Sequence, residues 1–350
     1  MKNILLKIRS LILFLPICLF AQVIDSNKSL ESTPPLFDEV NVNIDGFLDE
    51  DPWSKSLFLS KFTSYLPVDG RPAEDDTHIK IWYTSKALYI GITAWEIHDE
   101  VRSTLADRDN LENDDYILLF LDTYDDQRSA YAFAVNPIGQ QGDGIITDRT
   151  TTLSRNSTLT FNLDDNPDYV FTSKGRLTDR GYVVEIEIPF KSLRYKKSDI
   201  QNWGFNVLRR VQHSGYRSTL FNVNLDVASF LAQSGKLVNI SGIDRDKIFE
   251  ISPEFRTSLQ RGPAPEKYKS SSNDLLGVNM RYGLSSNIIL NGTVNPDFSQ
   301  IEADVAQINY DPRRSLFFPE KRPFFLDGIE FFSAPSRLIY TRKIANPAAA

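Results

Sequence analysis

Acidic side chains are the most numerous groups in this chain that could do chemistry. Of its 350 residues, 46 are Asp or Glu and three are His. A glycosidase needs two carboxylates at a set separation. Adjacent pairs such as Asp75-Asp76, Asp125-Asp126 and Asp164-Asp165 are instead typical of solvated turns. The residues therefore lean against an enzyme; if the chain is one, the predicted class is a hydrolase acting on O-glycosyl bonds.

Two other kinds of chemical site are weakly indicated. None of the three histidines lies in a nucleophile motif, so a Ser/His/Asp arrangement is not predicted. Calcium prefers several oxygen ligands from one ordered loop, and the candidates Asp122, Asp125 and Asp126 lack such spacing. We expect no catalytic residue, no cofactor and no metal, with calcium at these three aspartates kept as the weaker alternative.

Composition excludes one class of partner and indicates export. The net charge of −7 and the pI of about 5.2 leave no basic stripe for nucleic acid. Residues 1–21 have a positive start, a short apolar core and a small residue, Ala21, at the end, as in a cleaved signal peptide. Its removal takes away Cys18, the only cysteine. The mature chain is then predicted to have neither disulfides nor thiolate metal sites.

The elements that would position these side chains are short strands. The run from Asp114 to Asp122 holds six consecutive apolar or aromatic residues between acidic ends, which indicates a strand buried on both faces. Further strands are predicted at 77–83, 87–95, 131–135, 169–173, 175–177, 182–188, 203–211 and 216–222. We expect a turn at 139–144 and a mobile loop at 150–168. The predicted fold class is all-β, an antiparallel β-sandwich.

The pattern changes after Gly242. In segments of about ten residues, apolar and polar residues alternate, so that each strand would have one apolar and one polar face. This pattern is typical of a transmembrane β-barrel or of a second sandwich. Because a barrel must close, a chain that stops at Ala350 is expected to be the front part of a longer protein. The predicted domains are a signal peptide (1–21), a flexible lead-in (22–38), a β-sandwich (39–245) and the first strands of a truncated outer-membrane β-barrel (246–350).

Residues from about Val40 to Ile243 carry a series of motifs in a characteristic order. They include Ile44-Asp45-Gly46, Ala87-Leu88-Tyr89-Ile90-Gly91, Val135-Asn136-Pro137, Gly181-Tyr182-Val183-Val184-Glu185-Ile186 and Trp203-Gly204-Phe205-Asn206. On these residues the segment resembles the family 9 carbohydrate-binding modules. The resemblance implies a β-sandwich that binds a glycan or the end of an oligosaccharide.

Two further motifs lie beyond the sandwich. They are Asn295-Pro296-Asp297-Phe298-Ser299-Gln300-Ile301-Glu302-Ala303-Asp304 and Phe318-Pro319-Glu320-Lys321-Arg322-Pro323-Phe324-Phe325. They resemble a domain family of unknown function that follows such modules in Gram-negative outer-membrane proteins. This resemblance implies a barrel in contact with outer-membrane lipid, with the sandwich on its periplasmic or extracellular side.

The resemblance to the family 9 modules also implies a set of binding residues. Modules of this family that bind sugar ends hold the sugar between two tryptophans, because the C–H faces of a sugar pack on aromatic planes while polar groups meet its hydroxyls. Those two positions correspond to Leu111 and to residues near Phe230, and an acidic contact corresponds to Glu96. The residues implied by the resemblance are Glu96, Leu111, Asn113, Asp114 and Phe230. Trp95 completes the candidate carbohydrate-binding set as an aromatic side chain that could supply another platform for a sugar, with packing in the core or at an edge as the alternative. A family glutamate and arginine correspond to Ile117 and Ala134, so part of the cradle is missing.

Three functions remain open at this level. The first is a carbohydrate-binding module attached to an outer-membrane barrel, supporting polysaccharide catabolism. The second is a periplasmic interaction or plug module of a transport or assembly barrel, without sugar binding. The third is the non-catalytic part of a membrane-associated glycoside hydrolase. Function depends on the site and not on the fold, so the position of the six candidate residues decides among them.

Overall fold

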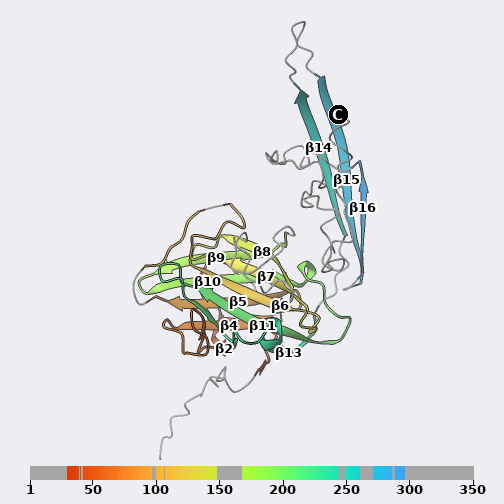
Figure 1. Ribbon diagram of the computed structural model, residues 1–350. Coiled ribbons are helices and arrows are strands. Elements are labelled where there is room, and N and C mark those ends of the chain that lie inside the picture. The colour runs from red at the N-terminus through yellow and green to blue at the C-terminus, as the bar shows by residue number, and fades with distance from the viewer. Residues whose placement is uncertain are drawn as a thin grey trace, which may run out of the picture.

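The computed structural model describes residues 30–38, 40, 42–96, 100–105, 107–147, 168–243, 249–260, 271–285 and 288–295. Two sheets in this part of the chain face one another, and a third sheet of three strands is separate from them (Figure 1). Within these ranges the helical elements are short: α1 (Asp51–Ser54) and two 3-10 turns, η2 (Phe190–Ser192) and η3 (Leu231–Gln233). The predicted β-sandwich is confirmed.

One layer of the sandwich, here called the small sheet, has five antiparallel strands in the order β2-β4-β5-β10-β9. Their bounds are Leu57–Leu59, Thr77–Tyr83, Ala87–Trp95, Gly181–Pro189 and Thr172–Thr178. The second and third coincide with the predicted strands at 77–83 and 87–95, where apolar and polar residues alternate. Of the two strands predicted at 169–173 and 175–177, residues 169–171 lie outside any strand, and the rest fall in one continuous strand, β9.

The other layer, the large sheet, has eight strands. Six follow the order β1-β13-β11-β6-β7-β8, while β12 pairs with β11 and β3 pairs with β12. The bounds are β1 Glu31–Ser32, β13 Gly235–Ser241, β11 Ile200–Arg210, β6 Tyr116–Asp122, β7 Ser129–Val135, β8 Gln141–Thr147, β12 Arg217–Thr219 and β3 Thr63–Leu66.

The turn predicted at 139–144 is wrong beyond residue 140. Gln141 to Thr147 form β8, and Gly142 and Gly144 pair with Ala134 and Ala132 of β7. Glycine weakens the interior of a strand. Here the pairing with β7 holds β8 in the sheet, and the Leu111 side chain packs over Gly142, where it would lie 3.4 Å from an added Cβ. Tertiary pairing thus overrides the local preference.

The central strand β6 is buried along its whole length, as predicted. Ile117, Leu119 and Leu121 face the small sheet and join the main apolar core between the layers. Tyr116, Leu118 and Phe120 face outward and join a second apolar cluster on the outer face of the large sheet. A strand with two buried faces explains the unbroken apolar run in the sequence.

The segment before the sandwich differs in part from the predicted flexible lead-in. Glu31 and Ser32 pair in parallel with β13, and the Phe37 N–H donates to the carbonyl of Tyr83 at 2.9 Å. The Phe37 ring also packs edge-on against Trp82, with 5.7 Å between the centroids. Backbone hydrogen bonds and an aromatic contact attach residues 31–37 to both sheets. These residues are therefore part of the sandwich and not of a flexible lead-in.

The third sheet, here called the C-terminal sheet, consists of β14 (Phe249–Gln260), β15 (Ser271–Ser285) and β16 (Ile288–Val294) in that order. All pairs are antiparallel. The alternation after Gly242 predicted these strands. The barrel to which they are predicted to belong stays a prediction.

Several of the predicted segments lie outside the described residues: the signal peptide (1–21), the loop at 150–168 except Asp168, and the motifs that begin at Asn295 and Phe318 except Asn295. Among the described helices, none has the length and apolar character needed to cross a bilayer.

Candidate functional site

The six candidate sugar-binding residues do not meet at one place. Trp95 is the last residue of β5 and points away from the core, while the next residue, Glu96, points into it, because consecutive side chains of a strand alternate between faces. Leu111 and Phe230 belong to the cluster on the outer face of the other sheet. A single small sugar cannot contact all of these residues.

The outer face of the large sheet is filled with apolar side chains. Leu111 has no exposed surface and Phe230 is 3% exposed. The Phe230 ring packs against Phe120 and Tyr65, with centroid separations of 4.9 and 5.9 Å. The two positions that would sandwich a sugar in the family therefore form a core here. Leu111 and Phe230 as sugar contacts are a wrong prediction for this structure.

The two polar candidates at the same edge have different environments. Asn113 is exposed, whereas Asp114 is fully buried. The Asp114 carboxylate accepts hydrogen bonds from the Thr104 N–H at 3.0 Å and from the Asn136 side-chain amide at 2.8 Å. These bonds join the loop before β6 to the end of β7, so Asp114 has a structural task and its oxygens face the protein.

Glu96 belongs to a polar cluster at one end of the core, centred on Arg209. The Arg209 side chain is 1% exposed, donates to the carbonyl of Asp76 at 3.1 Å and to the Thr77 hydroxyl at 3.0 Å, and lies 3.8 Å from Glu96 Oε2. Asp115 lies in the same cluster. Burial raises the pKa of its carboxyl to about 6, while the hydrogen bond that it accepts from the Gln212 N–H lowers that pKa. The cluster satisfies much of its charge internally.

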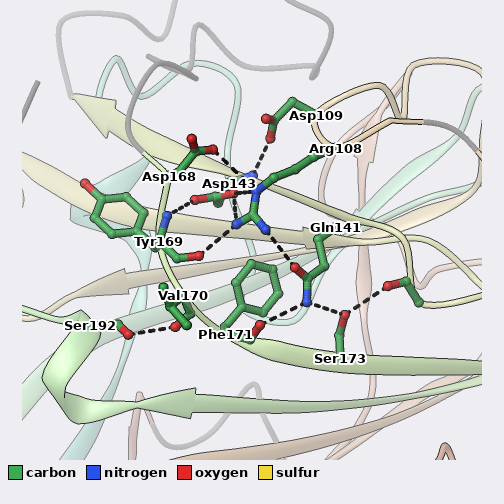
Figure 2. Close-up of polar contacts among 11 residues, drawn as sticks. Arg108, Asp109, Gln141, Asp143, Asp168, Tyr169, Val170, Phe171, Ser173 and Ser192 are labelled. Atoms are coloured by element: carbon green, nitrogen blue, oxygen red, sulfur yellow. Dashed lines mark hydrogen bonds and ion pairs between the residues drawn. The ribbon is translucent and has the colours of Figure 1, made fainter. Parts of the chain in front are cut away.

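A second arginine cluster lies beside β8 (Figure 2). Arg108 donates through Nε to Asp143 at 2.7 Å, through Nη1 to the Gln141 side chain at 2.8 Å and through Nη2 to the Tyr169 carbonyl at 2.7 Å. Asp168 Oδ1 is 3.5 Å from the same Nε. The cluster therefore holds the strand edge to the segment that follows residue 167.

Three carboxylates of the described residues come close enough to hold a metal, and two of them, Asp143 and Asp168, also contact Arg108. Oxygens of Asp109, Asp143 and Asp168 lie within 4.8 Å of one another. Burial raises the pKa of the Asp143 carboxyl to about 6, although the Tyr169 N–H and the guanidinium oppose this. Arg108 already supplies positive charge here, so these oxygens are a poor set for a cation.

The predicted calcium ligands are engaged elsewhere. Asp122 accepts from the N–H groups of Tyr124 at 3.2 Å and Gln127 at 2.7 Å. Asp125 forms an ion pair with Lys236 at 2.7 Å. These contacts are those of a capped turn, and calcium at Asp122, Asp125 and Asp126 stays an untested alternative.

The outer face of the small sheet is only partly covered. The segment around Leu48 and Trp53 covers its centre, where a Cβ on Gly91 would lie 2.6 Å from Leu48. Beside this cover, three half-buried aromatic side chains form a row: Phe58, His78 and Trp95. The ring centroids of Phe58 and His78 are 4.8 Å apart, and those of His78 and Trp95 are 4.3 Å apart.

Of the six candidates, Trp95 alone combines a large aromatic face with partial exposure. Burial lowers the pKa of its neighbour His78, so the imidazole is neutral near pH 7 and offers a ring without charge. The sequence analysis missed Phe58 and His78 as partners of Trp95. Alternation in β4 placed His78 outward, but only the β2–β4 and β4–β5 registers bring the three rings together.

The family model described as "Domain of unknown function (DUF5916)" matches residues 252–349. No curated protein matches the sequence. Among solved structures, the chain is similar to a carbohydrate binding module family 9 (CBM9) from Caldicellulosiruptor kristjanssonii in complex with cellotriose, at 15% identity and a TM-score of 0.41, over 58% of this chain and 91% of that one. The same module in complex with glucose gives 15% identity and a TM-score of 0.41, over 59% and 95%.

Proposed function

We propose that this chain is a carbohydrate-binding module attached to an outer-membrane β-barrel, where it supports polysaccharide catabolism. The observation that carries the proposal is the half-exposed aromatic row Phe58–His78–Trp95 on a rigid sheet. An aromatic ring held on a sheet is suited to the C–H face of a sugar. The three rings meet edge-on, at 75° and 72°, so each would offer its own face and not one shared plane. The family resemblance of residues 40–243 supports the same class of ligand.

The attachment to lipid is supported by the C-terminal sheet. The register places Phe249, Ile251 and Phe255 on the same face as Leu276, Met280, Leu290 and Val294 of the neighbouring strands. These side chains are 45–73% exposed. A continuous exposed apolar face of this kind marks a contact with a partner or with hydrocarbon.

The opposite face of that sheet is polar and linked by hydrogen bonds. The Asn279 side-chain amide donates to Glu254, and the Thr293 hydroxyl donates to Asn279 at 2.6 Å. Arg281 lies 3.8 Å from Glu250. A sheet with one apolar face and one polar face is suited to separate lipid from a polar interior.

Carbohydrate binding is tested by isothermal titration of the full chain with a panel of oligosaccharides. Wild type is expected to release or absorb heat with at least one member, and Trp95→Ala is expected to weaken that binding about tenfold or more. Tyr216→Ala removes an exposed aromatic side chain elsewhere (43% exposed) and is the matched control. Absence of binding to every sugar would overturn the carbohydrate part of the proposal.

Membrane attachment is tested separately by flotation of the full chain with phospholipid vesicles. Wild type is expected to float with the vesicles, and the double variant Phe255→Lys, Leu290→Lys is expected to lose most of this association, because a lysine on a lipid face costs up to about 2–4 kcal/mol at the bilayer midplane. Asn291→Lys places a charge on the opposite face and is the control. If wild type stays in the soluble fraction, the lipid contact is wrong.

A further inference from the structure

We propose that the outer face of the small sheet binds an acidic oligosaccharide, whose sugar rings pack on Trp95 and His78 and whose carboxylate is held by Arg176. The inference rests on the proposed carbohydrate binding and names its face and ligand class. It places the ligand on the opposite layer of the sandwich from the apolar cluster that contains Leu111 and Phe230.

A row of side chains crosses four strands of this face. His78 on β4 lies opposite Thr93 on β5, Thr93 lies opposite Val183 on β10, and Val183 lies opposite Arg176 on β9. Neighbouring strands are about 4.8 Å apart, so the row from His78 to Arg176 is longer than one sugar unit, with Val183, 7% exposed, as its least accessible member. It runs from an aromatic end to a cationic end.

Trp95 flanks this row without a bulky neighbour. Its partner on β10 is Gly181, which carries no side chain. Gly181 has φ +135°, and a Cβ there would lie 2.1 Å from the carbonyl of Ala94. The backbone therefore demands glycine at this position, and β10 places no side chain beside the indole ring there.

Arg176 is held in place at the other end of the row. Its Nε donates to the Gly46 carbonyl at 3.3 Å, and its guanidinium carbon lies 4.2 Å from the centroid of the Phe47 ring. In the part of the chain that the structure describes, the two Nη groups make no hydrogen bond. A stacked guanidinium with free Nη groups is suited to bidentate recognition of a carboxylate.

Cationic side chains gather at one end of this face even though the whole chain carries −7. The strands place Lys80, Lys174 and Arg176 on it, together with two acidic residues. Of these, Glu185 is fully buried under the turn at 45–46, and Glu187 accepts a hydrogen bond from the Tyr89 hydroxyl at 3.0 Å. The nearby Asp45 carboxylate accepts from the N–H of Phe47 at 3.0 Å. Three cationic side chains therefore share this face with the accessible carboxylates of Glu187 and Asp45, and Asp76 lies near His78 at the aromatic end.

Titration of the full chain with trigalacturonic acid and with cellotriose tests the inference. We expect wild type to bind the acidic trisaccharide about tenfold more tightly, with an affinity that falls as salt is added. Arg176→Gln is expected to abolish the preference, and Arg176→Lys to keep only part of it, since a lysine cannot bind a carboxylate in a bidentate manner. Arg128→Gln removes an exposed arginine elsewhere and is the control.

A blocking variant addresses the row itself. Thr93→Glu puts a bulky negative side chain at a half-exposed position in the middle of the row, and thermal unfolding by circular dichroism checks that the sandwich is intact. Loss of binding to both trisaccharides is expected.

The outcomes separate the two proposals. If wild type binds a sugar but shows no acidic preference, or if Arg176→Gln or Thr93→Glu binds like wild type, the inference is wrong and carbohydrate binding stands. If Phe230→Leu weakens binding and Thr93→Glu does not, the ligand lies on the large sheet. If wild type binds neither these sugars nor any other, carbohydrate binding itself fails.

Discussion

The sandwich and the C-terminal sheet use the same alternation of apolar and polar residues with opposite results. In β4 and β5 the inward residues Ile79, Ile81, Ile90 and Ile92 have no exposed surface. In β14 the equivalent residues Phe249 and Phe255 are 60% and 73% exposed. The difference is not in the strands but in what covers them: the sandwich has a facing layer, and the described part of the C-terminal sheet has none.

This comparison shows which residues carry the stability of the fold. Burial of apolar area contributes about 25 cal/mol per Å², so side chains of the sandwich core contribute and the exposed apolar face contributes little until something binds it. Variants in the two regions should therefore differ strongly in their effect on unfolding. Three predictions, in order of decreasing effect, test this difference.

Arg209→Met is expected to have the largest effect. The substitution removes a fully buried positive charge that lies 3.8 Å from Glu96 Oε2 and 4.0 Å from Asp75 Oδ2. Removal of one partner from a buried ion pair costs about 3–5 kcal/mol, and urea unfolding of the full chain measures this loss. A loss below about 1 kcal/mol would show that the end of the core is hydrated and not packed.

Glu185→Gln is expected to have an intermediate effect that depends on pH. Burial raises the pKa of this carboxyl to about 7, although the N–H groups of Asp45 and Gly46 each donate to it at 3.0 Å. The folded chain then binds the proton more tightly than the unfolded chain does. The stability from this group is complete below its ordinary pKa and is lost as the pH rises through about 7.

The glutamine variant keeps an oxygen acceptor and cannot ionise, so it should avoid that loss. We expect it to be more stable than wild type by about 2 kcal/mol at pH 8 and nearly equal to it at pH 5, as measured by urea unfolding at both values. Asp115 and Asp143 still titrate near pH 6 in both proteins and cancel in the comparison. An equal difference at both pH values would contradict the assignment.

Phe255→Ser is expected to have the smallest effect. Its side chain is 73% exposed, and exposed substitutions usually change stability by no more than about 0.5 kcal/mol. Thermal unfolding of the sandwich should therefore be unchanged, and Leu225→Ala at an exposed position of the sandwich is the reference. A large loss would mean that the apolar face packs on the protein itself, which would remove the main support for a lipid contact.

The sites differ in how far they could be predicted. Trp95 was recognised from its residue type as an aromatic side chain that could face a sugar. The partners of Trp95 and the role of Arg176 depend on register across four strands, which no local pattern reveals. Leu111 and Phe230 were misplaced because a resemblance transfers positions but not the side chains that fill the space between them.

The sequence by itself determined the class of fold, the buried central strand and the change of character after Gly242, because a period of two and an unbroken apolar run are local properties. Only the tertiary structure decided that Gly142 and Gly144 lie in a strand, that the outer face of the large sheet is closed and that the small sheet presents an aromatic row beside a cationic end. Each of these depends on which side chain from a distant part of the chain covers a given face, and hydrophobic burial depends on that covering group.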